Sequence, residues 1–260
     1  MERKIYLYDG TYTGLLTALS VIEKKREKPG NICPKGSYRP GLFDKIITIT
    51  TDPAETADFL NTLEKVLVRR SLDHIFRVFL SSVQHKEMAI YRYVRLGFET
   101  QKKLDYFLSD ERVKFIHDHA RKVSVEAHRM RGLVRFRELQ DGWLYAPIET
   151  DHYVLPLIIR HFSQRLPQKQ WFIHDIKRKK IAIHNLTYPR IFDVKNYRVP
   201  ELSFKEAEHQ KIWQEYFKNI AIKDRKNVRL QRQFMPKRYW KYLTEMEVIH
   251  NEETCTRYHP

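Results

Sequence analysis

The hydrophobic residues of this chain change their spacing at Gly132. From Pro53 to about Arg131 they recur every three to four positions, which is the spacing of amphipathic helices. Residues 133–148 instead alternate between apolar and polar side chains, which is typical of strands with one buried face. Because a run of helices followed by strands must bury one against the other, the pattern predicts a helix-rich α+β protein.

The first fifty residues predict a short strand–helix–strand unit. Residues 5–8 and 46–50 alternate like strands, and residues 15–27 have helical spacing. A connection of this length permits the two strands to pair in parallel. The basic stretch at 29–41 contains three glycines and three prolines, so we expect a long loop there.

After the change of period, the pattern predicts an antiparallel β-β-α-β-β unit followed by two helices. Asp141–Gly142 suits the turn of the first hairpin, and Ser203 with Glu206 forms a helix-opening capping box. The expected elements are a hairpin over 133–148, a helix over 153–166, a second hairpin over 171–184, and helices over 203–220 and 236–246. We expect one compact domain with four parts: the N-terminal region (1–125), the β-β-α-β-β unit (126–200), C-terminal helices packed on it (201–248) and a tail (249–260).

Net charge is the strongest compositional signal. The chain carries 48 Lys and Arg against 32 Asp and Glu, a formal net charge of +16. Residues 121–190 hold 14 basic and 6 acidic side chains, which is half of the excess. Such an imbalance favours a polyanionic partner. Because no basic helix is amphipathic enough to lie on a membrane surface, nucleic acid is the leading candidate.

Several other classes of protein are disfavoured. The longest uninterrupted apolar run, residues 154–159, is much shorter than a membrane span, and the N-terminus has no secretory hydrophobic segment. We therefore expect a cytoplasmic protein without a membrane partner. Two cysteines, Cys33 and Cys255, cannot form a disulfide framework or a four-thiolate site. The histidines match no metal-binding motif, so we expect no metal and no cofactor.

Two basic stretches could bind phosphates. The first carries Arg129, Arg131, Arg135 and Arg137, whose planar guanidinium groups suit phosphate, although a solvated strand face paired with nearby carboxylates would also explain them. The second, residues 223–241, has eight basic residues against one acid, with aromatic residues interleaved, which is typical of single-strand binding. Its candidates are Arg225, Asn227, Arg232, Lys237, Arg238, Tyr239 and Lys241, with Tyr239 as a stacking residue. Alternatively, its aromatic residues dock the segment on the core.

Acid–base chemistry is the second possibility. His161 and Arg165 share a helix face, and His174, Asp175 and Arg178 follow in the next hairpin. Structural polar contacts explain such pairs equally well. The remaining candidate acid–base groups are Asp9, at the end of the first strand, and Glu126 and His128, beside the first basic stretch.

Taken together, these motifs resemble a bacterial family assigned to DNA metabolism and built on a domain of unknown function. The resemblance rests on residues 126–137, His161-Phe-x-x-Arg165, the stretch 171–178, Ile212-Trp-x-x-Tyr216, residues 220–227, residues 235–241 and Tyr8-Asp9-Gly10. It implies an association with a radical SAM protein of DNA modification or repair, whose genes neighbour those of the family. A similar domain is fused to some uracil-DNA glycosylase-like proteins. The resemblance identifies no catalytic residues.

We expect a DNA-binding accessory protein that presents substrate to a radical SAM enzyme. Contact with about six phosphates would give a slope of roughly −5 for log affinity against log salt. The alternatives are a nucleic-acid-processing enzyme that uses His and Asp, and a protein–protein adaptor. An enzyme requires at least two of its acid–base groups to converge, whereas DNA binding requires residues 126–137 and 225–241 to share one face.

Overall fold

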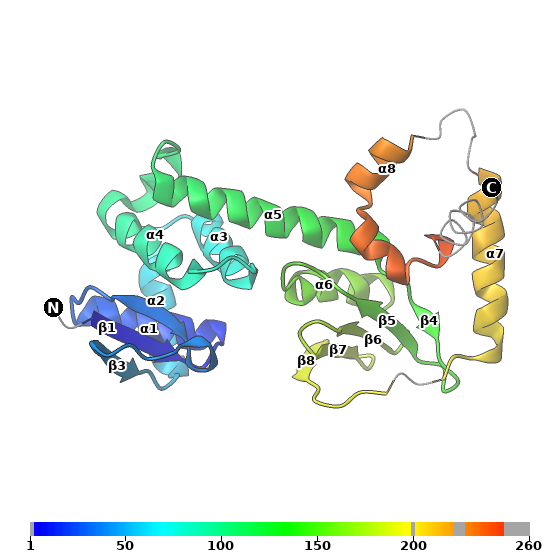
Figure 1. Ribbon diagram of the computed structural model, residues 1–260, viewed down its shortest axis with the longest axis horizontal. Coiled ribbons are helices and arrows are strands. Elements are labelled where there is room, and N and C mark those ends of the chain that lie inside the picture. The colour runs from blue at the N-terminus through cyan, green and yellow to red at the C-terminus, as the bar shows by residue number, and fades with distance from the viewer. Residues whose placement is uncertain (1–2, 199–200, 221–226, 247–260) are drawn as a thin grey trace. The chain divides into compact units, whose positions relative to one another are not determined.

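The computed structural model describes residues 3–198, 201–220 and 227–246 of the chain (Figure 1). The chain divides into two compact units, Met1–Ser124 and Val125–Pro260, which we call unit 1 and unit 2. The boundary falls inside one long helix, α5 (Glu111–Leu133). Both units combine helices with a small sheet, and the α+β class predicted from the sequence is confirmed.

Unit 1 begins with a three-stranded parallel sheet. Strand β1 (Arg3–Tyr8) lies between β2 (Asn31–Pro34) and β3 (Asp44–Thr48). Helix α1 (Tyr12–Lys24) follows β1, and the Thr11 hydroxyl accepts a hydrogen bond from the Gly14 N–H to cap it. The expected strand–helix–strand with a parallel pair is confirmed, but the loop expected at 29–41 contains β2 and a short 3₁₀ turn, η1 (Lys35–Ser37).

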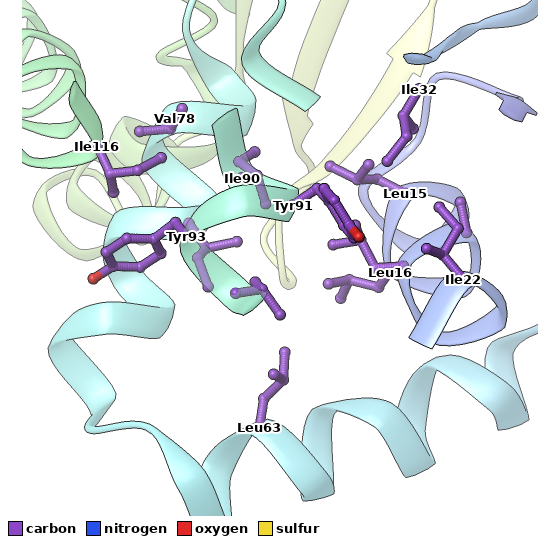
Figure 2. Close-up of a cluster of buried hydrophobic side chains, with 14 of the residues drawn as sticks. Leu15, Leu16, Ile22, Ile32, Leu63, Val78, Ile90, Tyr91, Tyr93 and Ile116 are labelled. Carbon is purple, nitrogen blue, oxygen red and sulfur yellow. The ribbon is translucent and has the colours of Figure 1, made fainter. Parts of the chain in front are cut away.

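Helices make up the rest of unit 1 and cover a single apolar core. Asp52 caps the first of them through the N–H groups of Ala54 and Glu55, as its sequence predicts. Figure 2 shows side chains from the sheet and the helices meeting in this core, among them Leu16, Ile90 and Ile116. The helices are α2 (Pro53–Val66), α3 (Arg69–Leu80), α4 (Lys86–Thr100), the 3₁₀ helix η2 (Gln101–Tyr106) and the first part of α5.

Unit 2 is built on a five-stranded sheet with the order β4-β5-β6-β7-β8. Its strands are β4 (Arg137–Glu138), β5 (Leu144–Ile148), β6 (Trp171–Asp175), β7 (Lys180–His184) and β8 (Arg190–Asp193). Helix α6 (Leu155–Arg165) connects β5 to β6 and packs Ile158 and Phe162 into a core that also contains Trp171. The sheet was expected to be antiparallel throughout. Because a helix makes this connection, β5 and β6 pair in parallel, whereas the other pairs are antiparallel.

The first strand expected in unit 2 is much shorter than predicted. Helix α5 extends to Leu133, and only two residues of the stretch 133–139 form a strand. Ala127, Met130 and Val134 are buried at helical spacing, and the Val134 N–H donates to the Met130 carbonyl at 3.1 Å. The helical face therefore continues to Val134, and Arg135 lies outside the strand.

Two helices and a 3₁₀ segment complete the described part of unit 2: α7 (Phe204–Ile220), α8 (Val228–Phe234) and η4 (Lys237–Tyr242). The Ser203 hydroxyl accepts the Glu206 N–H at 3.1 Å, which confirms the expected helix start. The Glu206 carboxylate does not complete the capping box but accepts the N–H of Glu138 in β4 at 2.8 Å. Among the described helices, none has the length and apolar character that crossing a membrane requires.

Candidate nucleic-acid interface

A groove of about 520 Å³ opens in unit 2 between the end of α5, the edge of the sheet, the end of α6 and helix α7. Its lining combines cations with rings and includes Arg135, Phe136, Arg165, His209 and Trp213. The groove is open to solvent along its length. Its size and mixed lining suit a planar or charged ligand.

Helix α7 forms one wall of the groove because its inward residues recur at helical spacing. Glu206, His209, Gln210 and Trp213 all line it. Glu206 fixes the start of the helix, since its carboxylate accepts the Glu138 N–H at 2.8 Å and the Gln210 amide at 2.7 Å. The wall is therefore attached to the sheet at the end where the groove begins.

Arg131, His161 and Arg165 form what we call the basic cluster. Arg131 and Arg165 are exposed, and in the described part of the chain neither guanidinium forms an ion pair or a hydrogen bond. Burial lowers the pKa of His161, and the positive charges of the two arginines lower it further. Because Gly132 and Arg165 line the groove, the cluster lies at its edge. Two unneutralised guanidinium groups in this position form a site for an anion.

Two aromatic residues of α7 stack on each other. The ring centroids of Trp213 and Tyr216 are 5.7 Å apart with an interplanar angle of 26°. Their exposed fractions are 40% and 54%. The Trp213 Nε1–H donates to a carboxylate oxygen of Glu245 at 3.0 Å, which holds the indole in place. The pair offers a fixed aromatic surface to a base.

Arg135 is in the groove, but its charge is already neutralised. Its guanidinium pairs with the buried carboxylate of Glu245 at 2.6 Å and lies 5.7 Å from the Trp213 ring. Burial alone would raise the pKa of Glu245, but the hydrogen bonds and charge of Arg135 outweigh it and lower that pKa. Arg135 therefore positions Glu245 and Trp213, which corrects its predicted role as a free phosphate ligand.

Several other predicted phosphate ligands also have partners within unit 2. Arg178 pairs with Asp175 at 3.0 Å and donates to the Thr150 and Asp151 carbonyls, so it joins loops inside the unit. Arg129 donates to the Gln233 carbonyl at 2.9 Å, and Asn227 caps α8 through the Leu230 N–H. Arg238 pairs with Asp151 at 3.1 Å and Lys241 with Glu149 at 3.2 Å, both partly exposed.

The remaining basic candidates are less constrained. Arg232 and Lys237 are exposed, and the Lys237 ammonium lies 5.5 Å from the Trp240 ring centroid. Arg137 is partly buried in β4. Arg225 lies outside the described residues.

Tyr239 does not fit the stacking role that its sequence context suggested. Its side chain is 5% exposed, and its hydroxyl donates to Glu126 at 2.6 Å. The ring packs in the core of unit 2 and presents no face to a base. The structure instead offers Trp213 and Tyr216, whose spacing of three on an amphipathic helix was the signal available in the sequence.

The six candidate acid–base groups do not form a constellation. Glu126 is buried and accepts the backbone N–H groups of Asp151 and His152 at 2.9 and 2.7 Å, which is a structural role. His128 is exposed, and His161 belongs to the basic cluster. Asp9 lies in unit 1, where it accepts hydrogen bonds from Thr11 and Thr51.

His174 and Asp175 alternate across β6 and so point to opposite faces of the sheet. Burial lowers the pKa of His174, which lies 3.4 Å from the Tyr145 hydroxyl, and burial raises the pKa of Asp175 despite its ion pair with Arg178. Within the described residues, no hydrogen bond or ion pair joins two of the six candidates.

A scan against protein-family models matched residues 84–245 to a domain of unknown function, DUF4130. The chain belongs to the DUF4130 family. The DUF4130 match includes every residue that lines the groove, together with Arg131 and His161. It also includes the C-terminal part of unit 1. Searches of curated proteins and of solved structures found no match.

Proposed function

We propose that this DUF4130 protein binds DNA in the groove of unit 2 and acts as an accessory protein in DNA metabolism or repair. The observation that carries the proposal is the pairing of two unneutralised arginines, Arg131 and Arg165, with the exposed Trp213–Tyr216 stack around one groove. Cations at the edge neutralise phosphates, and rings on the wall accept bases.

The groove favours single-stranded DNA. A base can lie on an aromatic ring only if it is unstacked from its neighbours, which a continuous duplex does not allow without distortion. The chain has a net charge of +16, which attracts either form at low salt. Selectivity for single strands therefore depends on the Trp213–Tyr216 stack, and attraction depends on the surrounding cations.

The structure lowers the number of phosphates that we expect the chain to neutralise. Arg135, Arg178, Arg238 and Lys241 all have carboxylate partners, so few of the predicted cations are fully available. With about three phosphates neutralised, log affinity for a single strand would fall with log salt at a slope of roughly −2.

The test measures fluorescence anisotropy of labelled oligonucleotides against the full-length chain over a salt series. We expect single strands to bind more tightly than duplexes of the same length and to show that slope. An affinity that does not change with salt, or equal affinity for both forms, would refute binding through this groove.

A radical SAM protein is the partner that we propose for the accessory role. Support comes from the family resemblance and from apolar side chains exposed on α7, namely Phe204, Ile212 and Ile220, which a protein partner could cover. Co-purification of the two proteins that persists after nuclease treatment would support direct contact. Loss of the complex on nuclease treatment would show that DNA alone joins them.

A further inference from the structure

Three side chains of unit 1 meet in a small cluster away from the groove residues. His74 comes from α3, Asp105 from η2 and His117 from α5, and each offers one ligand atom within 4.8 Å of the others. His117 Nε2 lies 2.7 Å from Asp105 Oδ1, and His74 Nδ1 lies 3.8 Å from the same oxygen. The two imidazole centroids are 4.5 Å apart. No local motif predicts this cluster, because each residue comes from a different element.

The cluster is largely buried. The exposed fractions of the side chains are 12% for His74, 12% for Asp105 and 18% for His117. His74 Nδ1 is a buried atom that makes no hydrogen bond within the described residues. A buried polar atom without a partner is costly, so such an atom requires an explanation. The narrow opening that remains is enough for a water molecule to approach.

Two further side chains hold the carboxylate of Asp105. The Tyr93 hydroxyl donates to Oδ1 at 2.6 Å, and the Ser71 hydroxyl donates to Oδ2 at 2.8 Å. Figure 2 shows Tyr93 with its ring in the apolar core and its hydroxyl pointing away from the other labelled side chains. Outer hydrogen bonds of this kind orient the ligands of metal sites.

The same hydrogen bonds keep Asp105 ionised. Burial alone would raise its pKa, but hydrogen bonds from His74, Tyr93, His117 and Ser71 outweigh burial and hold that pKa far below its usual range. An oriented anionic carboxylate beside two imidazole groups is the donor set that divalent transition metals bind in proteins.

We propose that His74, Asp105 and His117 form a binding site for a divalent transition-metal ion. Three protein ligands leave at least one coordination position for water. Ligand atoms about 2.1 Å from a tetrahedral ion lie roughly 3.4 Å from one another. The 2.7 Å contact of His117 must therefore lengthen and the 3.8 Å contact of His74 must shorten, each by less than 1 Å. Metal binding also displaces the proton that His117 and Asp105 share.

The test begins with the full-length chain after dialysis against a chelator. Titration with CoCl₂, followed by visible absorption, and with ZnCl₂, followed by calorimetry, should each give one ion per chain. Intense cobalt absorption would indicate tetrahedral coordination, as expected for zinc, and weak absorption would indicate six-coordination, as expected for iron. Either spectrum supports the site. Absence of stoichiometric binding by both metals would overturn the proposal.

Substitutions then locate the bound ion. His74→Ala and His117→Ala each remove a ligand, and we expect affinity to fall by more than about 100-fold, since loss of an outer hydrogen bond alone costs roughly 10–100-fold. Ser71→Ala and Tyr93→Phe remove only outer hydrogen bonds and should fall in that smaller range. A graded loss of this kind separates metal ligation from a purely structural polar cluster.

His119→Ala is the matched control, because His119 is on the same helix but its Nδ1 bonds the Phe115 carbonyl at 2.8 Å. Its metal affinity should equal that of the unchanged chain. Circular dichroism without metal shows whether each variant is folded. Folded His74→Ala and His117→Ala variants that bind cobalt as tightly as the control would refute the site.

Discussion

Removing the two unpaired arginines of the basic cluster should weaken single-strand binding by an amount that the structure fixes. Arg131→Ala with Arg165→Ala deletes two cations that have no partner in the described residues, so their loss disturbs no internal ion pair. Each phosphate contact on a single strand contributes about 0.7 to the salt slope, so the slope should decrease in magnitude by roughly 1.4. At 0.1 M salt this is a loss of about 25-fold, or about 2 kcal/mol.

The assay is fluorescence anisotropy with a labelled single strand between 50 and 200 mM salt. Lys24→Ala with Arg95→Ala is the matched control, since it removes the same charge from residues of unit 1 that pair with Glu55 and Glu23. If the control lowers affinity and slope as much as the basic-cluster variant, net charge alone explains binding and the groove has no special role. An unchanged slope in the basic-cluster variant would also refute the reasoning.

Three further predictions concern side chains of unit 2. Trp213→Ala should weaken single-strand binding by about 1–3 kcal/mol, whereas Trp213→Phe should retain most of the affinity because a ring remains; equal losses measured by anisotropy would contradict stacking. Glu126→Ala leaves two backbone N–H groups and the Tyr239 hydroxyl without an acceptor, so urea unfolding should show a loss of about 3 kcal/mol or more, followed by tryptophan fluorescence because all four tryptophans are in unit 2. Arg135→Ala should destabilise by about 3–5 kcal/mol at neutral pH, measured in the same way, because it leaves Glu245 buried and unpaired.

Glu245 also gives unit 2 a pH dependence with a defined sign. Its pKa is lowered in the folded state, so its contribution to stability is present above the unfolded value of about 4.3 and is lost as pH falls through the folded value. Unfolding by urea at a series of pH values should show this loss in the unchanged chain and a smaller one in Glu245→Gln. Equal pH dependence in both would contradict the role of the Arg135 pair.

Local signals in the sequence predicted most of the elements. Asp52 marked a helix start correctly because an N-cap depends only on the next three residues. Strand β2 was missed because its four residues include Asn31 and Pro34 and bury only Ile32, so they show neither alternation nor an apolar run. The parallel pairing of β5 with β6 depends on how α6 crosses the sheet, which hydrophobic spacing alone does not reveal.

The candidate site could be predicted only in part, because partners distant in the sequence decide which charges are available. Arg131 and Arg165 were identified as cations, but nothing local distinguished them from Arg135, whose partner Glu245 is 110 residues away. The same limit applies to Tyr239, which an acid from another helix draws into the core. His74, Asp105 and His117 show no spacing that a motif would detect.

The indole of Trp213 is already immobilised before any ligand arrives, since Glu245 holds its nitrogen and Tyr216 covers one face. A side chain that is still in the free protein loses little rotational freedom when a second ring lies against it, so more of the contact energy is retained as affinity. Glu245 thus withdraws the charge of one arginine from the solvent and, in exchange, keeps a flat receptor ready for occupancy.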